Sequence, residues 1–155
     1  MKLRFEKSSR HGKITGDFGE SLILYWLSKH GYECAKVDHT GIDIIARHPG
    51  SREVLGISVK SRSRTPGTEK SHLAIPRNEF EKAAQACRAF KCVPYFALVI
   101  DAGAITRAFL LPMEHLSKLC PGKRVAAWQM GESHLRKYYA DPKIIVIELC
   151  NSRQW

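Results

Sequence analysis

The sequence predicts an α/β fold in which helices flank a mixed β-sheet. Stretches of helical and strand-like periodicity follow one another in the order helix–strand–strand–strand–helix–strand, which is typical of a sandwich of helices and sheet. Hydrophobic residues make up 44% of the 155 positions, enough to build a packed core. The length suits one domain, and no linker rich in proline, glycine or serine divides the chain. We therefore expect residues 1–155 to form a single domain.

The expected elements begin with a basic arm and a helix. Residues 1–14 carry several basic side chains without apolar periodicity, so we expect them to form the arm. The helix is expected to begin at Thr15 or Asp17, either of which can cap its free N–H groups, and to end at Gly31. Apolar residues then recur at helical spacing at Phe18, Leu22, Ile23, Trp26 and Leu27.

Three short strands are expected next, over residues 32–37, 42–47 and 54–61. The pair Thr40-Gly41 and the run Pro49-Gly50-Ser51 supply the turns between them. The second turn predicts that the last two of these strands pair as a hairpin.

A second helix is expected over residues 79–90, capped by Asn78. The nearly unbroken apolar run over residues 95–100 predicts a buried strand, and a further strand is expected over 105–111.

We expect residues 15–111 to form the core and residues 112–155 to form a C-terminal elaboration. The elements expected in the elaboration are a helix over 114–119, a strand over 125–130, a helical turn over 132–139 and a closing strand over 144–149.

The charge of the chain predicts a polyanionic partner. There are 25 Lys and Arg residues against 15 Asp and Glu, a formal net charge of +10. Charge alone also fits a surplus that serves solubility, but its distribution is uneven. Between Ser58 and Arg77 the sequence has five cations and one acid, in a stretch with prolines and a glycine that predicts a loop. A basic loop leaving a strand can hold a phosphate backbone, and its candidate contacts are Arg62, Arg64, Lys70 and Arg77.

Several classes of protein are not supported by the sequence. The five cysteines are odd in number and form no CxxC pair, which argues against a disulfide scaffold or zinc module and favours a reducing, cytoplasmic location. No apolar run approaches the ~20 residues of a membrane helix, and the charged N-terminus does not resemble a signal peptide. HExxH, GxSxG and GxxxxGK[ST] motifs are absent from the sequence. The sequence therefore does not support a zinc hydrolase, a serine hydrolase or a P-loop NTPase.

One segment brings together residues that can carry chemistry. Asp43 lies inside an otherwise apolar strand, where a carboxylate is rarely found without a partner. Ser58 and Lys60 are two positions apart on the next strand and so share a face, while Ile57 and Val59 point into the core. If the two strands pair, an anion, a cation and a hydroxyl converge, and together they can hold a divalent metal and a phosphate. Hard oxygen ligands favour Mg²⁺ or Mn²⁺ over zinc. A cross-strand ion pair between Asp43 and Lys60 would explain the same spacing without catalysis.

These residues resemble the motif of the PD-(D/E)xK nuclease superfamily. Glu20 in the first helix, Asp43 after the glycine turn and Ser58-x-Lys60 on the following strand match its order, and the pattern is most similar to Holliday-junction resolvases and Mrr-like restriction nucleases. The resemblance covers about residues 15–100. It implies a restriction-endonuclease-like core, metal-dependent hydrolysis of DNA phosphodiesters, and a homodimer.

The resemblance also assigns roles to the individual residues. Asp43 would ligate the metal, Lys60 would position the attacking water, and Glu20 would act as a metal-side or water-positioning carboxylate. Glu20 has a simpler explanation as well, because it lies three residues after Asp17 and can complete a capping box.

The sequence departs from the family pattern at Ser58, where the family has Asp or Glu. In one interpretation the carboxylate has migrated to the next helix, where Glu79, or less favourably Glu81, replaces it as metal ligand, with Ser58 filling the vacated position. In the other interpretation the site is degenerate and the domain binds DNA without cutting it. Acids in a first helical turn are also favoured by the helix dipole regardless of function. We favour migration because Asp43 and Lys60 are both present.

The sequence thus predicts a Mg²⁺- or Mn²⁺-dependent DNA endonuclease. The alternative is a non-catalytic nucleic-acid-binding domain with a degenerate nuclease site.

Overall fold

The computed structural model describes residues 6–151. Its strands are β1 (Glu33–His39), β2 (Ile42–Arg47), β3 (Val54–Ser63), β4 (Leu73–Pro76), β5 (Val93–Asp101), β6 (Ile105–Pro112), β7 (Val125–Trp128) and β8 (Ile145–Cys150). Its helices are α1 (His11–Lys29), α2 (Arg77–Phe90), α3 (Met113–Leu119) and α4 (Glu132–Ala140). Every strand expected from the sequence is present, with ends that agree within two residues.

The larger of two sheets has six strands in the order β1-β2-β3-β5-β6-β8. β3 and β5 run parallel, whereas the other neighbours in this sheet are antiparallel. Parallel neighbours need a crossover connection, and here it runs through β4 and α2. β4 pairs separately with β7. The mixed sheet predicted from the sequence is confirmed.

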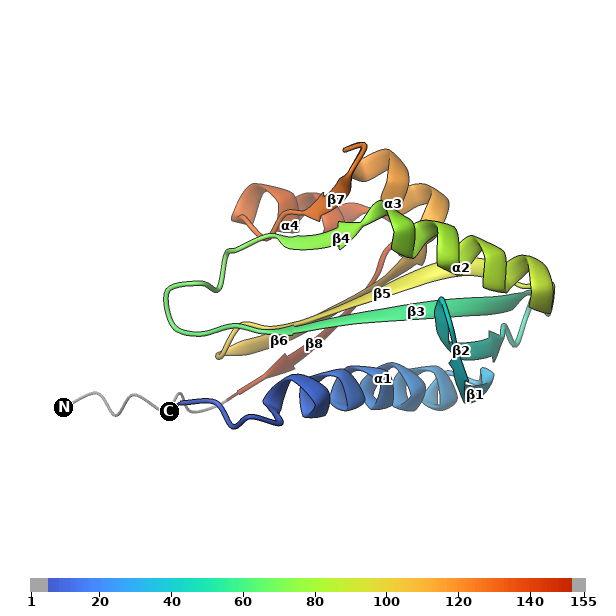
Figure 1. The fold of residues 1–155 in the computed structure, drawn as a ribbon, viewed down its shortest axis with the longest axis horizontal. Helices are drawn as coiled ribbons and strands as arrows, with labels where there is room; N and C mark the ends of the chain where they lie inside the picture. Colours follow the sequence, from blue (N-terminus) through green and yellow to red (C-terminus); the bar gives the residue numbers. More distant parts are fainter. Residues whose placement is uncertain (1–5, 152–155) are drawn as a thin grey trace.

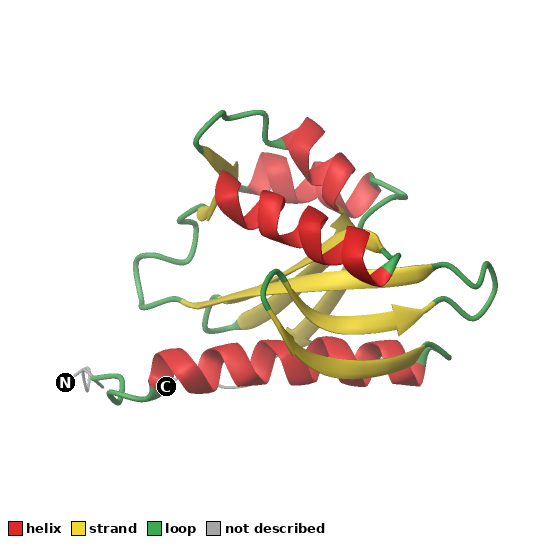
Figure 2. Cartoon of the chain, turned by 45° about the vertical axis from the view of Figure 1, so that its right-hand side comes forward, coloured by secondary structure: helices red, strands yellow, loops and turns green. Residues whose placement is uncertain are grey.

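The sheet is covered differently on its two faces (Figures 1 and 2). α1 lies along one face, and α2, α3, α4 and the small sheet cover the other. Ile57 and Val59 of β3 pack on the α1 side with Ile23 and Leu27. Their orientation confirms the alternation predicted for this strand, and it leaves Ser58 and Lys60 to the α2 face.

The first helix begins earlier than predicted. α1 starts at His11, so residues 11–14, which the prediction placed in the basic arm, are helical; residues 1–5 lie outside the described part. Neither Thr15 nor Asp17, the two predicted N-caps, caps this helix. The Thr15 hydroxyl donates to the carbonyl of His11 one turn earlier, and Asp17 forms an ion pair with Lys13 at 3.0 Å. Both are interactions of a helix interior.

The prediction for the start of the second helix was also wrong. Pro76, with φ −58° and ψ 142°, precedes a helix that begins at Arg77, and Asn78 lies inside it. Proline fits this position because its ring fixes φ and it has no N–H to leave unpaired. The basic stretch is also not all loop, because Leu73 and Ile75 are buried in β4.

The last third of the chain packs against the rest. β8 extends the sheet beside β6. On the opposite side of the sheet from α1, Trp128 stacks on Tyr138 with ring centroids 3.8 Å apart, next to Phe109 of β6.

None of the helices within residues 6–151 combines the length and apolarity needed to cross a lipid bilayer.

Candidate active site

Asp43 lies where β2 and β3 separate. The β2–β3 ladder ends at the pair Ile44–Ile57, and Oδ2 of Asp43 then accepts a hydrogen bond from the Val59 amide at 2.7 Å. The carboxylate thus takes the place of a strand partner for β3. This contact explains how an acid is accommodated on a strand in which every second residue is buried.

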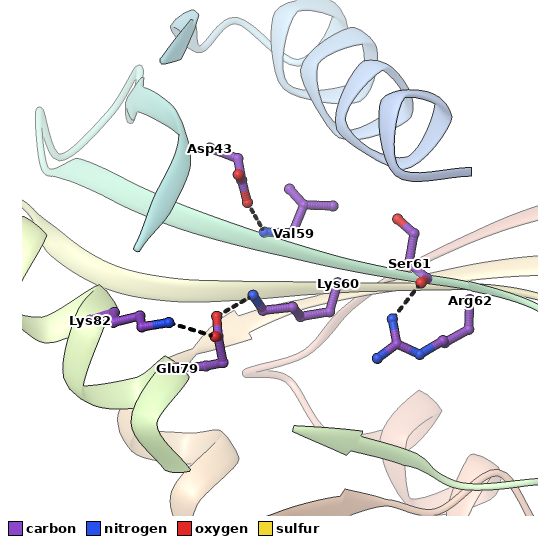
Figure 3. A network of polar contacts seen from close by, with 7 residues as sticks. All are labelled: Asp43, Val59, Lys60, Ser61, Arg62, Glu79 and Lys82. Carbon is purple, nitrogen blue, oxygen red and sulfur yellow. Dashed lines mark hydrogen bonds and ion pairs between the residues drawn. The ribbon is translucent and has the colours of Figure 1, made fainter. Parts of the chain in front are cut away.

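On the side of β3 that faces α2, Lys60 contacts Glu79 (Figure 3). Nζ of Lys60 lies 2.6 Å from Oε2 of Glu79, and each side chain is 23% exposed. The other oxygen of Glu79 accepts from Nζ of Lys82 at 3.3 Å, one turn further along α2. The hydrogen bond from Lys60 lowers the pKa of Glu79, so this carboxylate is ionised at neutral pH.

The surroundings of Asp43 are unfavourable for its negative charge. Burial raises its pKa, and the charges of Glu20 and Glu79 raise it further. The Val59 amide and the charge of Lys60 act in the opposite direction. The charges of Glu20 and Glu79 therefore add to the cost of ionising Asp43, a cost that a bound cation would lower.

Glu20 of α1 forms an ion pair with a lysine of β1. Its Oε2 lies 2.9 Å from Nζ of Lys36 on β1. Because α1 begins at His11, Glu20 is not in a first turn and makes no capping box with Asp17. Its charge is one of those that raise the pKa of Asp43.

Glu81, the other candidate carboxylate of α2, and Ser58, the position where the family has an acid, differ in exposure. Ser58 is 1% exposed and lies opposite Phe96 in the β3–β5 register. Glu81 is exposed, whereas the carboxylate within ion-pair distance of Lys60 is Glu79. Lys60 is therefore paired with α2 and not with Asp43, so the cross-strand ion pair is not formed.

The donor set suits a hard divalent cation that also binds substrate. Within residues 6–151 no group of three or more His, Cys, Asp and Glu side chains is placed to hold a metal ion. The site offers the carboxylates of Asp43 and Glu79, and among the described hydrogen bonds Asp43 uses only Oδ2. Mg²⁺ is commonly held by one or two carboxylates together with substrate phosphates, so these residues fit it.

Two of the four basic residues predicted to contact nucleic acid are exposed. Arg62 and Lys70 lie on the surface, and Arg62 contacts only the neighbouring Ser61 carbonyl among the described hydrogen bonds. Arg64 instead donates to the carbonyls of Ser71 and His72, at 3.2 and 2.9 Å, and so closes the loop on itself.

Arg77 is also occupied within the chain. It donates to the carbonyl of Gly122 at 2.6 Å, to Oγ of Ser117 at 3.2 Å and to the carbonyl of Cys120. Its guanidinium lies 4.6 Å from the ring centroid of Phe80. Arg77 therefore ties α2 to the segment after α3.

Sequence reasoning missed two lysines that belong to the site. Lys82 follows Glu79 by three residues in a helix, and that spacing alone could have indicated the ion pair. Lys36 is on a different element from Glu20, and nothing in the sequence marks their contact.

Comparison with solved structures gives a match over most of the chain. The fold is similar to that of Hjc, a Holliday junction resolvase from the archaeal hyperthermophile Archaeoglobus fulgidus, with a TM-score of 0.57 and 24% sequence identity. The match covers 79% of this chain and 88% of the resolvase. This chain has a resolvase-like fold.

The restriction-endonuclease-like fold implied by the PD-(D/E)xK resemblance is therefore confirmed. No family model matches the sequence, and no curated protein is significantly similar to it.

Proposed function

We propose that this chain is a metal-dependent DNA endonuclease that hydrolyses phosphodiester bonds, with one metal-binding carboxylate supplied from α2. The observation that carries the proposal is the Lys60–Glu79 contact of 2.6 Å. Where the family motif has an acid, β3 has the neutral Ser58, and α2 provides a carboxylate to the motif lysine instead. The resolvase-like fold supports the same class of activity.

The residues divide the chemistry between them. Asp43 and Glu79 would hold Mg²⁺ or Mn²⁺, because both provide carboxylate oxygens and Glu79 is ionised. The bound ion supplies Lewis-acid polarisation of the phosphate and makes water a stronger nucleophile. Lys60 would orient the attacking water and neutralise charge that develops on the phosphate. Glu20 would help to position water from the α1 side.

The proposed substrate is held by the exposed cations of the basic loop. Arg62 and Lys70 are exposed and so can contact phosphates, and Arg62 lies two residues beyond Lys60 on the same strand. DNA affinity should therefore depend steeply on salt, as expected for binding through phosphates. We also propose a homodimer, as the resemblance implies, and a cytoplasmic location, which suits the five free cysteines.

The proposal is tested by a cleavage assay on branched, linear and methylated DNA. Wild-type protein should cut at least one of these in Mg²⁺ or Mn²⁺ and not in EDTA. Lys60→Ala and Asp43→Ala should each lose about 10²–10³-fold in rate, the usual cost of removing one preorganised electrostatic group. Equal rates for wild type and both variants would reject the nuclease proposal.

A second function is favoured by one observation. Both oxygens of Glu79 already bind lysines, Oε2 binding Lys60 and Oε1 binding Lys82. This pairing fits a domain that binds DNA without cutting it. Salt-sensitive DNA binding by a wild-type protein that cleaves none of the three substrates would support this function.

A further inference from the structure

The turn between β1 and β2 rests directly on the backbone of α2, and Gly41 makes the contact. Gly41 has φ +96°, a conformation that residues with side chains rarely adopt. A Cβ at this position would lie 2.5 Å from the carbonyl carbon of Lys82 and 2.9 Å from the amide nitrogen of Ala83, and still closer to the Lys82 oxygen. All of these are backbone atoms, so no side-chain rotation can make room.

The two partners in this contact are the neighbours of the two candidate carboxylates. Gly41 precedes Asp43 by two residues, and Lys82 follows Glu79 by three. The side chain of Lys82 also binds Glu79 directly, at 3.3 Å. One residue of α2 thus touches the β1–β2 turn through its backbone and the Glu79 carboxylate through its side chain.

We infer that Gly41 is a positioning residue, which sets the separation of Asp43 from Glu79 by letting the β1–β2 turn pack on the backbone of α2. Any side chain there would push the start of β2 away from α2. Asp43 would move with it, and its carboxylate would leave the Val59 amide. The consequence for metal binding rests on the proposed function, whereas the placement of Asp43 does not.

The chain provides a matched control for this position. Gly103, in the turn between β5 and β6, has φ +83°, and a Cβ there would meet no atom within 4 Å. Gly103→Ala therefore carries a similar backbone cost to Gly41→Ala without the clash. Comparing the two variants separates the contact with α2 from the strain of a positive φ.

The test combines two measurements on wild type, Gly41→Ala and Gly103→Ala. Amide hydrogen exchange reports the Asp43–Val59 hydrogen bond, read as the rate at Val59 relative to core amides of β5. Calorimetric titration with Mn²⁺ reports the carboxylate pair. In Gly41→Ala we expect faster relative exchange at Val59 and a Mn²⁺ affinity weaker by about 10–100-fold, the usual cost of disturbing the support of a metal ligand. Gly103→Ala should match wild type in both.

The inference is overturned if Gly41→Ala and Gly103→Ala behave alike at Val59 and toward Mn²⁺. If Gly41→Ala does not fold, Gly41→Asn takes its place, because asparagine tolerates positive φ better than other residues with side chains. Failure of both to fold while Gly103→Ala folds would also overturn it, since the contact would then support the whole fold. If wild type neither binds Mn²⁺ nor cuts DNA, the proposed function fails, and exchange at Val59 alone decides the role of Gly41.

Discussion

Lys60 of β3 donates a hydrogen bond to Glu79 of α2 across 2.6 Å, joining the motif lysine to a carboxylate from a different element. The short separation and partial burial of both groups make this contact stronger than an exposed surface ion pair. It places a carboxylate beside Lys60 although Ser58 provides none.

Replacing Glu79 should slow cleavage strongly, whereas replacing Glu81 on the same helix should not. Glu79→Gln keeps the shape of the side chain but removes the charge that would bind the metal, so we expect a rate loss of at least about 10–100-fold. Glu81→Gln changes an exposed carboxylate on the same helix and should cleave like wild type. The measurement is the single-turnover rate in saturating Mg²⁺. Equal losses in the two variants would show that α2 does not supply the ligand through Glu79.

Returning the acid to β3 should rescue the loss of Glu79. In the double variant Ser58→Glu, Glu79→Gln, the new carboxylate stands at the family position on the face of Lys60, and part of the cleavage rate should return. Ser58→Glu alone should be less stable than wild type by about 1–3 kcal/mol, because it buries a carboxylate at a site that is 1% exposed. Urea unfolding and cleavage assays measure the two effects. A double variant no faster than Glu79→Gln would contradict the migrated-carboxylate account.

Asp43→Asn should make the protein more stable at neutral pH while removing activity. The pKa of Asp43 is raised, chiefly by burial, so folding favours its protonated form. Stability therefore falls as pH rises from the ordinary carboxyl range through the raised pKa, and the cost persists at neutral pH. Asparagine avoids this cost and keeps an oxygen that can accept from the Val59 amide.

Urea midpoints at two pH values check this sign. The variant should exceed wild type at neutral pH, and the difference should vanish near pH 3, below the ordinary carboxyl pKa of about 3.9. A wild type that is more stable than Asp43→Asn at neutral pH would show that the carboxylate serves the fold.

The four basic residues should separate into two pairs. Arg62→Ala and Lys70→Ala should each weaken DNA binding and reduce the slope of log affinity against log salt by about 0.9 for each phosphate that the variant no longer neutralises. Arg64→Ala and Arg77→Ala should instead lower stability, because their carbonyl partners lose a donor; for Arg77 we expect about 1–3 kcal/mol. Lys118, which is 67% exposed on α3, serves as the control.

Fluorescence anisotropy at several salt concentrations and urea unfolding measure these two groups of effects. An unchanged salt slope in both Arg62→Ala and Lys70→Ala would remove the basic loop from the binding surface.

The strands other than β4 could be predicted because their apolar runs are short and bounded by clear turns. The start of α1 could not, because Arg10 precedes it without a side-chain cap and residues 11–14 show no apolar periodicity. β4 was missed because its two buried residues, Leu73 and Ile75, stand within a basic stretch that has turn residues on both sides.

Within the candidate site, the alternation of β3 was enough to place Lys60 and Ser58 on one face. The pairing of Lys60 with Glu79 could not be predicted from a sequence pattern, because it depends on where the crossover connection places α2 against the sheet. The same limit applies to Arg77, whose acceptor carbonyl at Gly122 is 45 residues away in the chain.

The proposed carboxylate pair is tested most directly by an anomalous difference map from crystals of the wild-type protein soaked in Mn²⁺. We expect a peak bound by carboxylate oxygens of Asp43 and Glu79, next to Lys60. A map with no peak at these carboxylates, while crystals of the same protein diffract well in Mn²⁺, would contradict it.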